Sequence, residues 1–304
     1  MRRTVGLGLA CGAVVLLAAR RRQRPGGVQD QAAPARRSSV RPATLAVLRC
    51  PDTGEALEIA VSVGGGAPAL VGVPSGRQVP LRDGIPDFVD PATLVGSNAT
   101  WQRRYDRLAP VYDLATRLYA RLRSGGDAAR VREYLDEVQI APGSNVLEVS
   151  VGTGRNLHYL PSDAHYVGLD ISVGMLRRCR ANLRRWQQEA DLILGSAEQL
   201  PFADAAFDVV FHVGGINFFN DPMRAMDEMV RVAKPGTRIL VVDETEQVAG
   251  AYRHLPSRGA AATPRRPIDP LALVPAGMVD VRLKEVAHGE LYCLTFRTPA
   301  RSAR

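Results

Sequence analysis

Residues 146–156 read VLEVSVGTGRN and decide the fold of this chain of 304 residues. The apolar residues up to Val149 predict a buried strand over 145–149, and a glycine-rich turn follows it directly. Glycines at 152 and 154 allow the backbone to pass close to a bound ligand where a Cβ would collide. A helix is expected after the turn, and its unpaired N–H groups would face an anionic part of that ligand. The stretch therefore predicts a strand, a ligand-binding turn and a helix.

Strand-like and helix-like segments alternate on both sides of this stretch. Such alternation predicts a mostly parallel sheet with helices on both faces, and a late hairpin adds an antiparallel edge. The fold class is therefore α/β and Rossmann-like. The strands are expected at 166–169, 191–194, 207–212 and 238–243, the hairpin at 279–286 and 289–297, and the helices at 101–119, 127–138, 173–188 and 223–233.

Carboxylates stand where the first two of these strands end. Ligands of such sheets bind beyond the carboxyl ends of the strands, near the point where the strand order reverses. Glu148 at the first strand end could balance a positive charge on the ligand. Asp170 at the second strand end could accept hydrogen bonds from both hydroxyls of a ribose. The loop 195–202, GSAEQLPF, follows the third strand, where its backbone could contact an adenine edge.

Together these segments resemble class I methyltransferases, particularly the methyltransferase type 11 group that includes ubiquinone- and menaquinone-biosynthesis enzymes. The resemblance covers about residues 101–297. It also rests on YDRLAPVYD at 105–113, FDVVF at 207–211, RVAKPG at 231–236 and ILVVD at 239–243. It implies a seven-stranded sheet and S-adenosylmethionine as cofactor, with the segment 105–113 helping to close over it.

The resemblance also implies a set of cofactor-binding residues and shows two departures. The family usually carries glycine at the position of Ser150 and aspartate at that of Ser196. We expect Ser150 to be tolerated with a negative φ, and Ser196 to leave the adenine contact to backbone groups and Glu198. The implied cofactor-binding residues are Tyr105, Tyr112, Glu148, Gly152, Gly154, Asp170, Ile171, Met175, Ser196, Ala197, Glu198 and His212.

Two other functions are alternatives to methyl transfer. A nicotinamide oxidoreductase needs the pattern Gly-x-Gly-x-x-Gly, and Leu157 occupies the position of the third glycine, which argues against it. A non-catalytic cofactor-binding or partner-regulating protein is the alternative that Ser150 and Ser196 leave open.

Methyl transfer from a sulfonium makes modest demands on catalytic residues because its donor is already activated. The protein mainly orients the reactants and excludes water. His212 and Asp243, at the ends of the fourth and fifth strands, are the candidate catalytic residues. His212 is a general base or a pocket-lining residue, and lining is favoured. Asn217, Phe218 and Phe219 follow as candidates for contact with the acceptor, with ordinary packing as the alternative for the two phenylalanines.

The net positive charge of the chain comes from its N-terminal residues. Residues 1–41 carry nine arginines against Asp30 alone, which accounts for the whole net charge of +8. The remainder is neutral, which argues against a nucleic-acid partner and leaves a small-molecule substrate. The segment 246–269 has Arg253, Arg258, Arg265 and Arg266 with His254, and is either a solvated loop or a contact with an acidic substrate or phospholipid headgroups.

An unbroken apolar run occupies residues 5–19 between arginine clusters. A membrane span usually needs about 20 residues, so three interpretations remain: a short signal anchor, a cleaved secretory signal and an organelle presequence. The anchor is favoured, with the catalytic domain on the cytoplasmic side because positive charge is heavier after the run. We expect residues 1–24 to be this segment and 25–42 to be a disordered linker. Anchor and resemblance together favour a lipophilic acceptor.

Residues 43–90 are expected to form a small β-rich module ahead of a methyltransferase domain at 98–299. Short strands are predicted at 57–63 and 79–81, with a turn at 64–66. CPDTG at 50–54 with VPLRDGIPDF at 79–88 resembles a zinc-ribbon-like module, but zinc needs four ligands and only Cys50 is present. The module is therefore expected to bind no metal, and the scattered cysteines indicate no disulfide framework.

Overall fold

The protein is described from a computed structural model. It covers residues 40–60, 69–92, 94–123, 127–246, 248 and 268–300, with the backbone alone at 115, 117–123 and 127. The apolar run at 5–19, most of the predicted linker, the turn at 64–66 and the basic residues 253–266 lie outside the described residues. In the part of the chain that is described, no helix is both long and apolar enough to cross a membrane.

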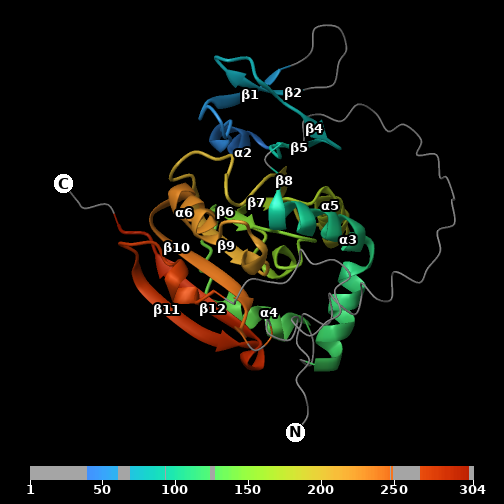
Figure 1. Ribbon diagram of the computed structural model, residues 1–304, viewed down its shortest axis with the longest axis vertical. Coiled ribbons are helices and arrows are strands. Elements are labelled where there is room, and N and C mark those ends of the chain that lie inside the picture. The colour runs from blue at the N-terminus through green and yellow to red at the C-terminus, as the bar shows by residue number, and fades with distance from the viewer. Residues whose placement is uncertain are drawn as a thin grey trace, which may run out of the picture.

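A seven-stranded sheet forms the centre of the molecule, with strand order β11-β12-β10-β9-β6-β7-β8 (Figure 1). The five strands from β6 to β10 are parallel, and β12 pairs antiparallel with both β10 and β11. The predicted α/β fold with an antiparallel hairpin is confirmed. The strands are β6 (Asn145–Val149), β7 (His165–Asp170), β8 (Asp191–Leu194), β9 (Phe207–Val213), β10 (Ala233–Glu244), β11 (Val279–Val286) and β12 (Leu291–Arg297).

The strand order reverses between β6 and β9, so a ligand crevice is expected beyond their carboxyl ends. Both faces of the central strands are buried, as the near-continuous apolar runs in the sequence require. One face packs against α6 (Pro222–Val232), and the other packs against α4 (Asp127–Leu135) and α5 (Val173–Trp186). The long helix α3 (Gly96–Arg123) packs against α5.

The helix expected directly after the glycine turn is absent from this described region. Its place is taken by η1, a single turn of 3-10 helix over Leu157–Tyr159. The turn ends at Tyr159 and Pro161 follows two residues later, so the chain has too few residues here to build an α-helix. The prediction was wrong, and with it the idea that a helix N-terminus faces the ligand at this turn.

The small N-terminal module packs on the edge of the main sheet at β8 (Figure 1). The backbone N–H of Phe88 donates to the carbonyl oxygen of Leu194 over 2.8 Å, and Leu48 forms a bridge with Phe202. Leu48 and Leu57 belong to the same hydrophobic core as Phe202 of the methyltransferase-like region. The module consists of α2 (Pro42–Val47), β1 (Ala56–Ala60), β2 (Ala69–Val73), β3 (Gln78–Val79), β4 (Leu81–Arg82) and β5 (Ile85–Pro86).

Cys50 of the module is buried. Within the described ranges, His, Cys, Asp and Glu side chains nowhere gather in a group of three that could hold a metal ion.

Candidate functional site

A cavity lies beyond the carboxyl ends of β6, β7, β9 and β10, with residues of α3 in its wall. It contains about 1560 Å³ of space, part of which is open to solvent. Ten of the predicted site residues line this cavity. They are Tyr105, Tyr112, Gly152, Asp170, Ile171, Met175, Ser196, Ala197, Glu198 and Asp243. Glu148, Gly154 and His212 lie outside its lining. The role of each lining residue in binding or catalysis stays a prediction.

Gly152 and Asp170 form the floor of the cavity. The backbone N–H of Gly152 donates to Asp170 Oδ2 over 2.8 Å, and that of Ser172 donates to Oδ1 over 2.8 Å. Burial raises the pKa of Asp170 to about 6, although these backbone bonds oppose the rise. A Cβ at Gly152 would meet nothing nearer than the carbonyl oxygen of Ser150 at 4.0 Å, so the turn faces open space. A ligand can therefore approach this backbone closely.

Two residues of the turn differ from expectation. Ser150 has φ +61°, in the left-handed region, so the predicted negative φ is wrong and the serine keeps the backbone shape that glycine adopts easily. Gly154 does not contact the cavity, and a Cβ there would lie 2.6 Å from Cys179 Sγ. Its glycine is thus needed for close packing against α5 rather than for approach of a ligand.

Glu148 lies behind the cavity wall in a chain of buried polar side chains. Its Oε1 accepts from Asn156 Nδ2 over 2.7 Å, and Asn156 Oδ1 accepts from the Tyr134 hydroxyl over 2.9 Å. The second oxygen, Oε2, is buried and has no hydrogen-bond partner among the described residues. Burial raises the pKa of Glu148 to about 8. A cation in the cavity would favour the ionised form of this carboxyl group.

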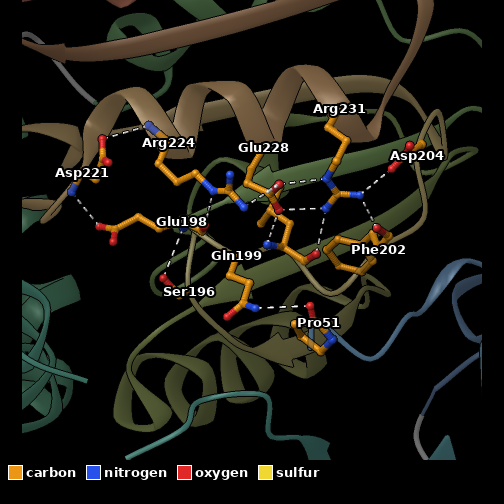
Figure 2. A network of polar contacts seen from close by, with 11 residues as sticks. Pro51, Ser196, Glu198, Gln199, Phe202, Asp204, Asp221, Arg224, Glu228 and Arg231 are labelled. Atoms are coloured by element: carbon orange, nitrogen blue, oxygen red, sulfur yellow. Dashed lines mark hydrogen bonds and ion pairs between the residues drawn. The ribbon is translucent and has the colours of Figure 1, made fainter. Parts of the chain in front are cut away.

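Polar contacts hold the loop that carries Ser196, Ala197 and Glu198 (Figure 2). Glu198 Oε1 accepts from Asn98 Nδ2 at 2.9 Å and from the backbone N–H groups of Asn220 at 2.8 Å and Asp221 at 3.1 Å. The Glu198 carboxylate thus joins the starts of α3 and α6 to the loop. The adenine contact predicted for this loop stays a prediction.

Helix α3 covers the cavity with aromatic side chains. Trp101 stacks on Phe218 with ring centroids 3.9 Å apart, and Tyr105 packs edge-on to Tyr112 at 6.2 Å. Asp106 fixes the helix above α5, because its Oδ1 accepts from Ser172 Oγ at 2.6 Å and from the Gly174 backbone N–H at 2.9 Å. The segment 105–113 therefore lies over the predicted cofactor site, as the sequence led us to expect.

Asp243 lies at the end of β10 with its carboxylate held by backbone donors. Oδ2 accepts from the N–H of Gly215 at 3.1 Å and of Asn217 at 3.3 Å, and Oδ1 accepts from that of Glu244 at 2.7 Å. Burial raises the pKa of Asp243 to about 6 despite these bonds. Near neutral pH the group is therefore mostly a carboxylate, with a pKa suited to proton transfer.

His212 is fully buried between β6 and β10 instead of facing the cavity. Its Nδ1 lies 3.1 Å from the carbonyl oxygen of Val149, which can only accept, so Nδ1 carries the proton of the neutral ring. Burial lowers the pKa of His212 to about 4. Its predicted place in the cavity lining is wrong, and the structure gives no support to its use as a general base.

The sequence reasoning missed several lining residues. Arg130 and Tyr134 come from α4, one helical turn apart, and Asn98 and Trp101 come from the start of α3. The spacing of Arg130 and Tyr134 places them on one helix face, which is a weak signal. Asn156 and Arg155 directly follow the glycine turn and could have been included with it.

Comparisons with known proteins agree with this arrangement. A family model described as a methyltransferase domain matches residues 147–241. A demethylmenaquinone methyltransferase of Renibacterium salmoninarum is 36% identical over 151 residues, which cover 49% of this chain and 60% of that protein. One of a Mycobacterium species (strain KMS) is 33% identical over 164 residues, which cover 52% of this chain and 69% of that protein. The chain thus spans less than two thirds of the first of these relatives.

A solved structure of a SAM dependent methyltransferase from Aquifex aeolicus is also similar, at 19% identity and a TM-score of 0.45, over 56% of this chain and 93% of that one.

The residues of the cavity fit the cofactor that this fold family binds. The open turn at Gly152 leaves space for a ligand, and Asp170 offers a carboxylate for ribose hydroxyls. Behind the cavity wall, the carboxyl group of Glu148 has one buried oxygen without a hydrogen-bond partner among the described residues, and a cation in the cavity would favour its ionised form. The fold, the fit and the relationship in sequence agree, and the chain belongs to the class I S-adenosylmethionine-dependent methyltransferases.

Proposed function

We propose that this protein transfers the methyl group of S-adenosylmethionine to a small lipophilic acceptor of the quinol type. The observation that carries the proposal is one cavity lined both by Asp170, at the end of β7, and by Asp243, at the end of β10, with an aromatic wall from α3. Two relatives are named demethylmenaquinone methyltransferases, which supports an aromatic, hydroxylated acceptor. When bound, the cofactor supplies an activated methyl group.

The donor end is formed by β6, β7 and the loop after β8. Asp170 would accept hydrogen bonds from the ribose hydroxyls, and Gly152 holds the carboxylate of Asp170 in place through its backbone N–H. The backbone at Ser196 and Ala197 lies in the cavity wall, where it would contact the adenine of the bound cofactor. These groups would orient the donor, and the rate enhancement would come from holding donor and acceptor close together in the right geometry.

The acceptor end is formed by β10 and the loop after β9. Asp243, ionised above about pH 6, accepts the proton of a phenolic hydroxyl and so activates an aromatic acceptor. Phe218, Phe219 and Val213 line the cavity with apolar surface, which suits a lipophilic ring and excludes water.

The test is to incubate the full chain with methyl-labelled S-adenosylmethionine and a cell extract separated into organic-soluble, aqueous and protein fractions. We expect label in an organic-soluble aromatic compound, and reduced demethylmenaquinone serves as a defined acceptor in a parallel reaction. Label confined to protein or to water-soluble compounds would contradict the acceptor class.

A non-catalytic cofactor-binding protein is the second candidate, and Ser150 favours it because a left-handed serine strains the cofactor turn. Binding of S-adenosylmethionine without label in any fraction would support that candidate.

Membrane anchoring through residues 5–19 is a separate proposal that rests on the sequence alone. Deletion of residues 1–24 should move the protein from the membrane to the soluble fraction. Identical fractionation of the two chains would contradict the anchor.

A further inference from the structure

More acidic than basic side chains line the cavity. Of the described residues that line it, four are acidic (Asp170, Glu198, Asp243 and Glu244) and two are basic (Arg130 and Arg155). The side chain of Arg130 is only 4% exposed, and its Nη1 donates to Glu290 Oε2 over 2.7 Å. A buried guanidinium in a cavity wall interacts strongly with nearby carboxylates, because little solvent screens the interaction.

The proposed donor brings a carboxylate into this acidic cavity. S-adenosylmethionine has adenine at one end, ribose in the middle and an amino acid at the other end, which carries the carboxylate. The helix N-terminus expected to receive this group does not exist here, because only the single 3-10 turn η1 follows the glycine turn. Another cationic or N–H-rich group must offset its charge.

The order of elements along the cavity matches the order of groups in the donor. The loop after β8 carries Ser196 and Ala197, the neighbouring strand β7 ends in Asp170, and β6 beyond it leads into the turn at Gly152. Helix α4 lies next to this turn, because the Tyr134 hydroxyl donates a hydrogen bond to Asn156 Oδ1 over 2.9 Å. Arg130 is one helical turn away from Tyr134 on the same helix. Adenine at the loop and ribose at Asp170 therefore bring the amino-acid end toward α4.

We propose that Arg130 binds the carboxylate at the amino-acid end of S-adenosylmethionine, and this inference rests on the function proposed above. A guanidinium has five N–H donors in a planar fork, so an arginine that donates to Glu290 can also bind a second carboxylate. Glu290 directly precedes β12 and acts as a positioning residue, because its carboxylate holds the guanidinium of Arg130. Arg130 thereby determines that the ligand must carry an anionic group.

Arg155 is the competing residue, and the structure favours Arg130 over it. Arg155 is half-buried in the loop after Gly154, whereas Arg130 is buried on a helix and fixed by an ion pair. A buried cation loses less solvation when it binds an anion than a half-buried one does.

Calorimetry with two ligands tests the proposal. S-adenosylhomocysteine carries the amino-acid end, and methylthioadenosine shares the adenosine and the sulfur but lacks the carboxylate. For Arg130→Met we expect affinity for S-adenosylhomocysteine to fall about 10- to 100-fold, because a charge-assisted pair is lost, with methylthioadenosine affinity within about threefold of wild type. The second ligand also shows that the variant is folded.

Arg132→Met, at an exposed arginine of the same helix α4, is the matched control and should leave affinity for S-adenosylhomocysteine within about threefold of wild type. Arg155→Met tests the competing lining residue. The double variant Arg130→Met, Glu290→Gln removes the carboxylate left without its partner and should show the same selective loss. An equal loss for both ligands, no loss for either, or a selective loss in Arg155→Met instead would overturn the assignment. Failure of the wild-type chain to bind either ligand would reject the proposed function itself.

Discussion

The backbone N–H of Gly152 donates to Oδ2 of Asp170 over 2.8 Å, so the glycine turn after β6 and the end of β7 form one unit. The turn thereby orients a carboxylate on the neighbouring strand as well as leaving room for a ligand. The ribose site proposed here thus depends on both strands.

Asp170→Asn should weaken binding of S-adenosylhomocysteine about 10- to 100-fold, because an amide accepts fewer hydroxyl hydrogen bonds than a carboxylate. The pKa of Asp170 is about 6, so wild-type affinity should fall as the pH drops below 6 and the group becomes protonated. Calorimetry over a pH series measures both effects. Asp163→Asn, an exposed carboxylate ahead of the same strand, should change neither, and a pH-independent wild type would contradict this role of Asp170.

Ser150→Gly should stabilise the protein by about 1 kcal/mol, because glycine adopts a φ of +61° without the strain that a Cβ causes. The gain is limited by the greater entropy of glycine in the unfolded chain. Thermal unfolding should show a midpoint about 3 °C higher. Ser150→Ala keeps the Cβ and should show no such increase, so an equal gain in both variants would count against strain as the cause.

Glu148→Gln should make stability less dependent on pH. The folded-state pKa of Glu148 is about 8 against an ordinary 4.5, so the folded chain holds a proton that the unfolded chain releases between these values. Wild-type stability from this group is full below about pH 4.5 and decreases up to about pH 8. Urea unfolding without ligand should find Glu148→Gln more stable by about 4 kcal/mol at pH 8 and nearly equal near pH 4.5. A constant difference across that range would exclude the proton linkage.

Asp243→Asn should lower kcat about 100-fold or more while leaving donor affinity unchanged, because only proton transfer from the acceptor is lost. With a phenolic acceptor, wild-type kcat/KM should decline below about pH 6, where Asp243 becomes protonated. Steady-state kinetics and calorimetry with S-adenosylhomocysteine separate the two effects. Asp280→Asn, at a 61% exposed carboxylate, is the control, and a loss of donor affinity in Asp243→Asn would place this residue at the donor end instead.

Leu48→Ala should destabilise the whole chain by about 2–5 kcal/mol, because this fully buried side chain joins the core of the module to that of the main sheet. Urea unfolding should still show a single transition, since the two regions share one core. Val73→Ala, at a side chain 44% exposed on β2, should cost little. Two separate transitions in the wild-type chain would show that the module folds on its own.

Much of the sheet was predictable from the sequence because its central strands are buried on both faces. Buried parallel strands appear as short runs of Val, Leu, Ile and Phe, and those at 145–149, 191–194 and 207–212 were placed within one residue of the observed ends. Asp170 and Asp243 were also found from sequence, because strand ends in such sheets meet at one crevice.

The parts that failed depend on contacts between distant segments. The left-handed φ of Ser150 follows from the geometry of the turn. The burial of His212 depends on which face of the sheet its side chain takes on the central strand β9. Arg130 and Tyr134 could be placed on one helix face, but only the folded chain brings that face to the cavity. Local patterns do not contain this information.

The contact between Phe88 and Leu194 has a consequence for solubility. Edge strands with free N–H and C=O groups pair readily with other chains, and the N–H of Phe88 and the bridge at Asp87 occupy the outer edge of β8. A shortened chain that starts after residue 90 would leave this edge without its cover. Such a fragment should aggregate at concentrations where the full chain stays in solution, so expression work is best done with the module attached.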